Sequence, residues 1–201
     1  MDIRVASDDA SAPVTDEELV RRLRDGDDWA GEDLATRHCS SLLRFLQRLV
    51  HSDHLAEELH QQTWTSALEN LDKFEVTSGN GGFKAWLYRI ATNKAHDHWR
   101  SRGREKKAKE GLRLVTEEAA PDAGHRLEGA EAEAKLRAAM ELLPQSQKEV
   151  LLLRYYGNLK FVEIAEMLGC PLNTALGRMH KAMIRLRQLL ADDAPVESRT
   201  S

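Results

Sequence analysis

Apolar residues recur every three or four positions through most of residues 16–102, which is the spacing of one buried helix face. Thr15, with Glu18 three residues later, is a candidate N-cap for the first helix. Three glycines in the segment DKFEVTSGNGG predict a loop before the last helix. The pattern therefore predicts four helices: a short one from Asp16, a longer one after the turn DGDD, one from about Asp53 to Leu71, and one over residues 83–102.

The helical spacing is lost over residues 103–130, where glycines and Pro121 stand among charged residues. It returns over residues 131–191 and predicts four further helices. Ser146 and Glu149 are a candidate capping box for the second of these. Further along the chain, helices are expected at about residues 160–168 and 172–190.

These patterns predict an all-α fold with two small four-helix domains. The first domain covers residues 16–102, the second covers residues 131–191, and a flexible charged linker over residues 103–130 joins them. Both chain ends, residues 1–15 and 192–201, are expected to be disordered. An aromatic content of only 5% agrees with helix rather than sheet.

The segment EIAEMLGCPLNTALGRMHKA, residues 163–182, predicts a helix–turn–helix. Gly169 suits a sharp turn, and Pro171 suits the start of the next helix. On that second helix the inward stripe is predicted to be Leu172, Ala175, Met179, Ala182, Met183 and Leu186. The opposite face is predicted to carry Asn173, Thr174, Gly177, Arg178, Lys181 and Arg185. Short polar residues followed by cations suit a recognition helix in the major groove, and a bundle hairpin with a solvated basic face is the alternative.

The formal net charge of −4 is unevenly distributed. Residues 99–109 hold six basic residues and one acidic residue, whereas residues 110–133 hold seven acidic and two basic ones. Residues 134–191 are basic again, with nine basic and four acidic residues. Because charges act over a Debye length of about 10 Å, the weakly acidic total does not exclude a polyanionic partner.

From Glu18 to Leu190 the chain resembles bacterial RNA polymerase sigma factors of the sigma-70 family, specifically the extracytoplasmic-function (ECF) type. AEELHQQTWTSALENLDKF is similar to the family's polymerase-docking segment, and FKAWLYRIATNKAHDHWRSRGR to its promoter-melting, −10-reading helix. LPQSQKEVLLLRYYGNLKFVEIAEMLGCP and the helix that follows it are similar to the −35-reading domain. The resemblance implies a protein that binds core RNA polymerase and promoter DNA, with an anti-sigma factor as a further expected partner.

Promoter melting requires side chains that capture unstacked bases, at about 1–3 kcal/mol for each stacked base. The resemblance makes Asn93 the best candidate to hold a flipped −10 base. The full set of candidate −10 residues is Trp86, Tyr88, Asn93, Lys94, His96, Trp99, Arg100 and Arg102. Trp86 and Trp99 have the alternative of being core residues. The candidate −35 residues are Asn173, Thr174, Gly177, Arg178 and Lys181.

A helix that docks on a coiled coil needs an apolar ridge flanked by polar residues. The candidate polymerase-binding residues are Leu55, Glu57, Glu58, Leu59, Gln61, Gln62 and Trp64, with Thr63 in the same ridge. Three positions depart from the family pattern. Gln62 stands where an acidic residue is usual, and Leu176 and Gly177 stand where a basic residue and a serine are usual. These departures put one interfacial charge pair and the −35 contact in doubt.

No convergent set of catalytic side chains is visible, so neither an enzyme activity nor a cofactor is expected. His96 and His98 stand too far apart around a helix for metal binding. Cys39 and Cys170 suggest reduced, buried thiols, and the acidic N-terminus resembles no signal peptide, so a cytoplasmic protein is expected. Two alternatives stay open: a regulator that binds an operator directly, and a degenerate sigma-like protein with weak DNA reading.

Overall fold

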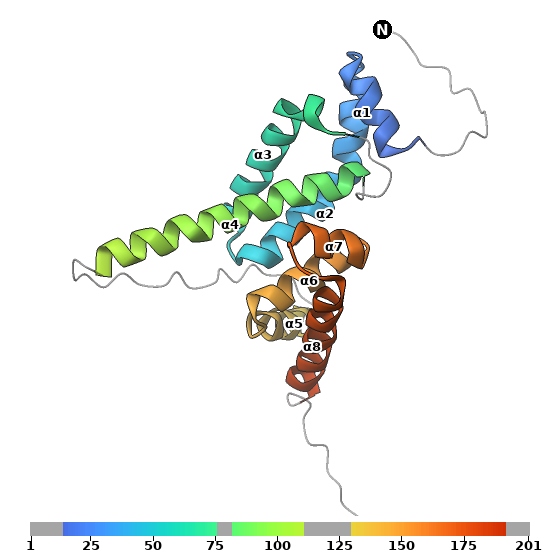
Figure 1. The fold of residues 1–201 in the computed structure, drawn as a ribbon. Helices are drawn as coiled ribbons and strands as arrows, with labels where there is room; N and C mark the ends of the chain where they lie inside the picture. Colours follow the sequence, from blue (N-terminus) through green and yellow to red (C-terminus); the bar gives the residue numbers. More distant parts are fainter. Residues whose placement is uncertain (1–13, 76–81, 111–129, 192–201) are drawn as a thin grey trace, which may run out of the picture.

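The computed structural model describes residues 14–75, 82–110 and 130–191, which form α-helices and one 3-10 turn without any strand (Figure 1). The all-α prediction is confirmed. The elements are α1 (Asp16–Arg24), α2 (Asp28–Val50), α3 (Asp53–Glu69), η1 (Leu71–Lys73), α4 (Gly82–Glu110), α5 (Ala130–Glu141), α6 (Gln145–Tyr155), α7 (Phe161–Met167) and α8 (Leu172–Ala191). The expected disorder at residues 1–13 and 192–201 lies outside the described residues. Helix α4 continues to Glu110, eight residues beyond the expected start of the linker.

Helices α1–α4 make the N-terminal domain, in which α2 contacts each of the other three. Local sequence signals set its helix boundaries. The Thr15 side chain accepts a hydrogen bond from the Glu18 backbone N–H at 3.2 Å, which confirms the predicted N-cap. Ser52 caps α3 in the same way, through the Leu55 N–H at 3.3 Å. The turn into Ser52 passes through His51, whose φ of 56° lies in the left-handed region.

A contact between distant parts of the chain positions the start of α4. The Glu17 carboxylate on α1 accepts a hydrogen bond from the Phe83 backbone N–H at 3.3 Å, and a negative charge there favours a helix N-terminus. Gly82 has a φ of 63°, and a Cβ built on it would lie 2.1 Å from the Glu17 carboxylate oxygen. Only glycine therefore lets α1 hold the beginning of α4.

Helices α5–α8 make the C-terminal domain, and α8 contacts the other three. The four consecutive residues 150–153 of α6 are all buried, because α6 packs against α8 and also against α2. Helices α7 and α8 form the predicted helix–turn–helix. Gly169 turns the chain with a φ of 60°, and the Cys170 N–H donates to the Ala165 carbonyl at 2.9 Å.

The predicted capping box at Ser146 and Glu149 is wrong. Helix α6 begins two residues earlier than this cap would place it, with Pro144 as its N-cap and no side-chain cap. Glu149 instead accepts a hydrogen bond from Gln145 at 3.1 Å and contacts His96 of α4. The Glu149 side chain thus takes part in a contact between the two domains and does not cap α6, as the local pattern predicted it would.

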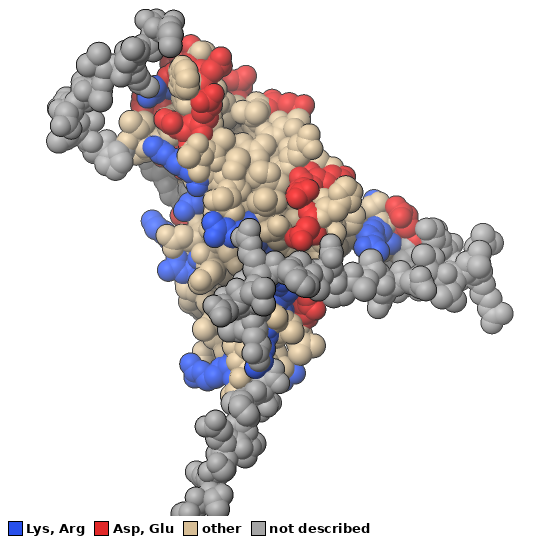
Figure 2. Space-filling view, turned by 180° about the vertical axis from the view of Figure 1, so that it is seen from behind, with Lys and Arg blue, Asp and Glu red and all other residues tan. Residues whose placement is uncertain are grey.

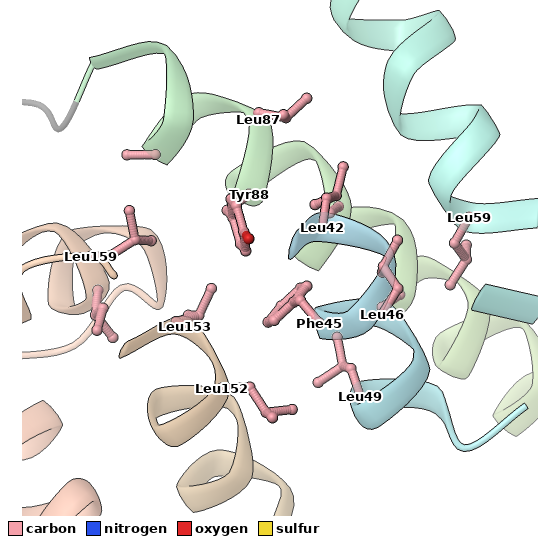
Figure 3. Packing of buried hydrophobic residues seen from close by; sticks show 14 of the residues in the cluster. Leu42, Phe45, Leu46, Leu49, Leu59, Leu87, Tyr88, Leu152, Leu153 and Leu159 are labelled. Carbon is pink, nitrogen blue, oxygen red and sulfur yellow. The ribbon is translucent and has the colours of Figure 1, made fainter. Parts of the chain in front are cut away.

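The two domains share one apolar cluster in this structure. Figure 3 shows Phe45 and Tyr88 of the N-terminal domain facing Leu152, Leu153 and Leu159 of the C-terminal domain. All five side chains are at most 2% exposed, and the Phe45 and Tyr88 rings lie 5.1 Å apart between centroids. Helix α2 contacts α6, and α4 contacts α7. We call this arrangement the closed conformation.

Candidate nucleic-acid and polymerase interfaces

The outer face of α4 carries an exposed polar stripe. Asn93, Asp97, Arg100 and Arg104 follow one another at i, i+4, i+7 and i+11, so they share one side of the helix, and all four are exposed. Trp86 lies two turns before Asn93 on the same side, half-buried against Phe74 and Phe83. The stripe thus offers an indole, a carboxamide, a carboxylate and two guanidinium groups in a row. We call it the α4 outer stripe.

The side of α4 that faces the C-terminal domain contains two of the predicted −10 residues. Tyr88 is fully buried, and its hydroxyl donates to the Tyr156 carbonyl at 3.1 Å. Burial raises the pKa of Tyr88 to about 12. His96, two turns later, lies with Nε2 2.8 Å from the Glu149 carboxylate. In the closed conformation burial makes Tyr88 unavailable to DNA, whereas His96, three residues after Asn93, lies half-buried at the edge of the outer stripe and is held by Glu149.

The other predicted −10 residues are divided between these faces and the helix end. Lys94 and Trp99 are half-buried, and the Trp99 ring lies 5.6 Å from that of His96. Arg102 is exposed, and Arg100 forms an exposed ion pair with Asp97 at 2.5 Å. Arg104, absent from the prediction, could have been found by extending the helical spacing i, i+4, i+7, i+11 from Asn93.

A buried polar cluster accompanies the contact between the domains. Lys148 of α6 is only 4% exposed, and its ammonium donates to His51 Nε2 at 2.7 Å. His51 Nδ1 lies 3.4 Å from the Glu141 carboxylate, so a neutral imidazole bridges the two charges. Burial, and then the Lys148 charge, lower the pKa of His51. Glu141 raises this pKa, and Arg48 and Arg137 lower it more weakly. Burial also lowers the pKa of Lys148.

Of the residues predicted to dock on polymerase, the structure exposes the polar ones of α3 and buries the centre of the ridge. Leu59 is 3% exposed and Thr63 is fully buried, and the Thr63 hydroxyl donates to the Leu59 carbonyl at 2.6 Å. These two residues pack in the domain core because they share the side of α3 that Ala56 and Ala67 also bury. The remaining predicted residues are exposed (Glu57, Glu58, Gln61 and Gln62) or half-buried (Leu55 and Trp64).

The exposed face of α3 has one large apolar residue that the prediction missed. Leu68 is 56% exposed and follows Glu57 and Gln61 at i+11 and i+7, on the same side of the helix. Gln62 donates to Glu58 at 3.0 Å across one turn. The face is therefore a line of carboxylates and carboxamides that ends in a leucine. A contact with a partner's basic and apolar side chains fits this composition.

The outer face of α8 differs from the predicted one. Ala175, Ala182 and Leu186 are buried as expected, but Leu172 is 42% exposed and Met183 is 45% exposed, so their placement in the inward stripe is wrong. Both lie on the flank of the helix, at the edge of the contact with α5, α6 and α7. The residues opposite the buried stripe are Asn173, Leu176, Gly177, His180, Lys181 and Ile184. Thr174 is exposed at one edge, where Arg178 is half-buried.

Basic and acidic side chains are separated over the surface that Figure 2 shows. Acidic side chains gather at the end that carries α1, whereas the lower part, formed by the C-terminal domain, shows mostly Lys and Arg. Among the described residues, no group of three or more His, Cys, Asp or Glu side chains could hold a metal ion. The helices that the structure describes include none with the length and apolarity needed to cross a bilayer.

Two family models match this chain in the order of its domains. The model for sigma-70 region 2 matches residues 34–105, and the model for sigma-70 region 4 matches residues 133–186. RNA polymerase sigma-H factor of Pseudomonas aeruginosa is 30% identical over 179 residues, which cover 83% of this chain and 89% of that protein. The chain belongs to the sigma-70 family. The ECF RNA polymerase sigma factor EcfG of Rhodopseudomonas palustris is 32% identical and matches 76% of this chain and 81% of its own length, which supports the ECF type.

A solved structure has the same fold. The sigma factor RpoE of Bartonella quintana, crystallised in complex with the anti-sigma factor NepR, matches with a TM-score of 0.64 and 26% identity over 81% of this chain and 97% of that one. The family and the fold together establish the function of the chain. This ECF sigma factor binds core RNA polymerase and directs promoter-specific initiation, reading −10 DNA with its N-terminal domain and −35 DNA with its helix–turn–helix. Sigma factors are in general transcription initiation factors and not enzymes.

Proposed function

We propose that the α4 outer stripe is the surface that opens and holds the −10 element. The matched region 2 contains the whole stripe, and Asn93 is exposed at its centre between Trp86 and Arg100. A carboxamide can hydrogen-bond the edge of an unpaired base, an indole can stack on it, and guanidinium groups bind phosphates. The exposure of Asn93 on this stripe is the observation that carries the proposal. Lys94 and Arg102 add further cations along the same helix.

Helix α3 is proposed to dock on core RNA polymerase through its exposed face. The polar residues Glu57, Glu58, Gln61 and Gln62 are all exposed there, with Leu68 at the end of the line. Leu59 and Thr63 support this helix from inside the domain. Because α3 and α4 pack against each other, docking through α3 would leave the outer stripe of α4 free for DNA.

The closed conformation is proposed to be inactive on promoters. The names of the −10 and −35 elements place them about 25 base pairs apart, which is about 85 Å along a duplex. Here α4 is in contact with α7, the helix that precedes α8, and α8 itself is only about 30 Å long. The two reading helices cannot span that distance while Tyr88 is bonded to Tyr156. The domains must therefore separate when the protein acts with polymerase.

A regulatory partner is proposed on the same grounds. The matched RpoE structure is a complex with an anti-sigma factor, and we expect this chain to have a partner of that kind. Such a partner would inhibit by holding the domains close together or by covering α3.

We further propose that the protein works in the cytoplasm, where its DNA and polymerase are, and that it performs no catalysis itself. The division into domains at residues 16–110 and 130–191 belongs to the same proposal.

Run-off transcription with core RNA polymerase and genomic DNA tests this function. The expected result is a set of discrete transcripts that appear only when the protein and core polymerase are both present, from start sites that share a −10 and −35 pair. Tight, sequence-specific binding to duplex DNA without polymerase would favour the direct operator-binding regulator. Polymerase binding without discrete transcripts would favour the degenerate sigma-like protein.

A further inference from the structure

We infer that Leu176 reads thymine methyl groups in the −35 element and that Gly177 lets α8 approach the base edges closely. The inference rests on the proposed use of α8 as the −35 helix, and it specifies the kind of base that this helix recognises. It concerns the two positions at which the chain departs from the basic residue and serine usual in the family.

Geometry places Gly177 near the centre of the outer face of α8 and Leu176 at one edge of that face. Asn173, Leu176, Gly177, His180 and Lys181 follow at i, i+3, i+4, i+7 and i+8, which is the spacing of a single helix face. This face lies opposite the buried stripe of the helix. Leu176 and Gly177 stand in the second turn, and the N-terminal part of a recognition helix is the part that reaches base edges.

Leu176 is an apolar side chain at one edge of a face whose other edge is basic. It is 41% exposed, with Lys181 exposed at the far edge of the face and Arg178 half-buried beyond that edge. Cations flanking the face fit a duplex, whose phosphates border the groove. Within the major groove the thymine 5-methyl group is the apolar feature, and apolar side chains recognise it by direct contact. An exposed leucine on a face with a basic edge therefore fits thymine better than any other base.

Gly177 has no structural explanation within the chain itself. A Cβ built at this position meets no atom within 4 Å, and its φ lies outside the left-handed region in which glycine is favoured. Glycine in a helix interior is less stable than alanine, so the protein bears a cost that packing does not require. The missing side chain leaves room beside Leu176 for a partner that approaches the backbone. The major-groove edge of the −35 bases is the partner that this face can receive.

The test is holoenzyme binding to promoter duplexes in which single −35 thymines are replaced by deoxyuridine, which removes only the 5-methyl group. The promoter is one recovered from the run-off experiment. We expect one or two positions at which this replacement weakens binding about fourfold, the effect of exposing one buried methyl group. Leu176→Ala should weaken binding to the thymine duplex by a similar factor and should bind the thymine and deoxyuridine duplexes equally.

Matched variants separate base reading from helix stability and from polymerase binding. Leu190→Ala removes a leucine of similar exposure, 39%, about 21 Å along the same helix, and should leave both duplexes unaffected. Gly177→Ala should raise the melting temperature and weaken −35 binding together. Leu176→Arg should lose the thymine preference and steepen the salt dependence by about one phosphate contact.

Three results would overturn the inference. The first is that Leu176→Ala leaves the sensitivity of binding to deoxyuridine in place at every −35 position. Another is a Gly177→Ala protein that is more stable and binds the −35 element as well as the parent does. The third is a Leu176→Ala protein whose defect lies in core polymerase binding. If the run-off experiment gives no discrete transcript, the proposed function itself fails, and that failure is seen before any −35 variant is made.

Discussion

The hydrogen bond between Tyr88 and Tyr156 gives a sharp test of the closed conformation. Tyr88→Phe keeps the ring packed against Phe45 and removes only the hydroxyl that donates to the Tyr156 carbonyl at 3.1 Å. A hydrogen bond of this kind contributes about 1 kcal/mol net, and in an open state water satisfies both groups. The change should therefore shift the equilibrium between closed and open conformations about fivefold towards open.

Core polymerase binding is the assay for this shift, because polymerase selects the open conformation. When the closed conformation dominates, a fivefold larger open fraction tightens the apparent affinity for core polymerase about fivefold. Energy transfer between dyes at the exposed positions Glu69 and Gln188 should fall in the same variant. Tyr155→Phe is the matched control, since Tyr155 is 78% exposed and precedes Tyr156 directly. An unchanged polymerase affinity with unchanged energy transfer would refute the role given to this hydrogen bond.

Three further predictions concern the reading helices and the polar cluster. Asn93→Ala should impair open-complex formation, followed by permanganate footprinting, more than polymerase affinity, and equal losses would show that Asn93 is structural. Arg178→Ala should weaken −35 binding and lower the salt slope by about 0.9, and an unchanged slope would argue against a phosphate contact. Acidification should open the domains, because the lowered pKa of His51 means that the open state binds more protons than the closed state below about pH 6.5. The contact that His51 makes with Lys148 and Glu141 is thus complete above that pH and is lost as the pH falls. Energy transfer between the two dyes, followed from pH 7.5 to 5.5, measures this opening. His51→Gln should flatten this pH dependence, and an equally steep profile in that variant would exclude His51 as the cause.

Sequence periodicity predicted the helices well because helix boundaries depend mostly on local signals. The Thr15 cap, the turn at Gly169 and the start of α8 after Pro171 all follow from a few neighbouring residues. The capping box at Ser146 failed because Glu149 contacts His96, a residue 53 positions earlier in the chain. No local pattern reports a contact over that distance.

The candidate site residues lie on the expected helices, but those grouped together do not always share a face. Tyr88 and Asn93 were grouped because both lie on α4, yet the contact between the domains buries Tyr88 and leaves Asn93 exposed. On α8 the outer face follows from the buried stripe of Ala175, Ala182 and Leu186, and counting from these residues would have placed Leu176 on it. Leu172 and Met183 were assigned to the inward stripe because they are apolar, although their positions on the helix place them on its flank.

Photo-crosslinking within an open promoter complex tests the central claim most directly. A crosslinking residue at Asp97, on the α4 outer stripe, should attach to DNA in the −10 region, and one at His180, on the outer face of α8, should attach in the −35 region. Both products should require core polymerase. Crosslinks from both positions to a single DNA region, or crosslinks of equal yield without polymerase, would contradict the claim that two separated domains of one sigma factor read the two promoter elements.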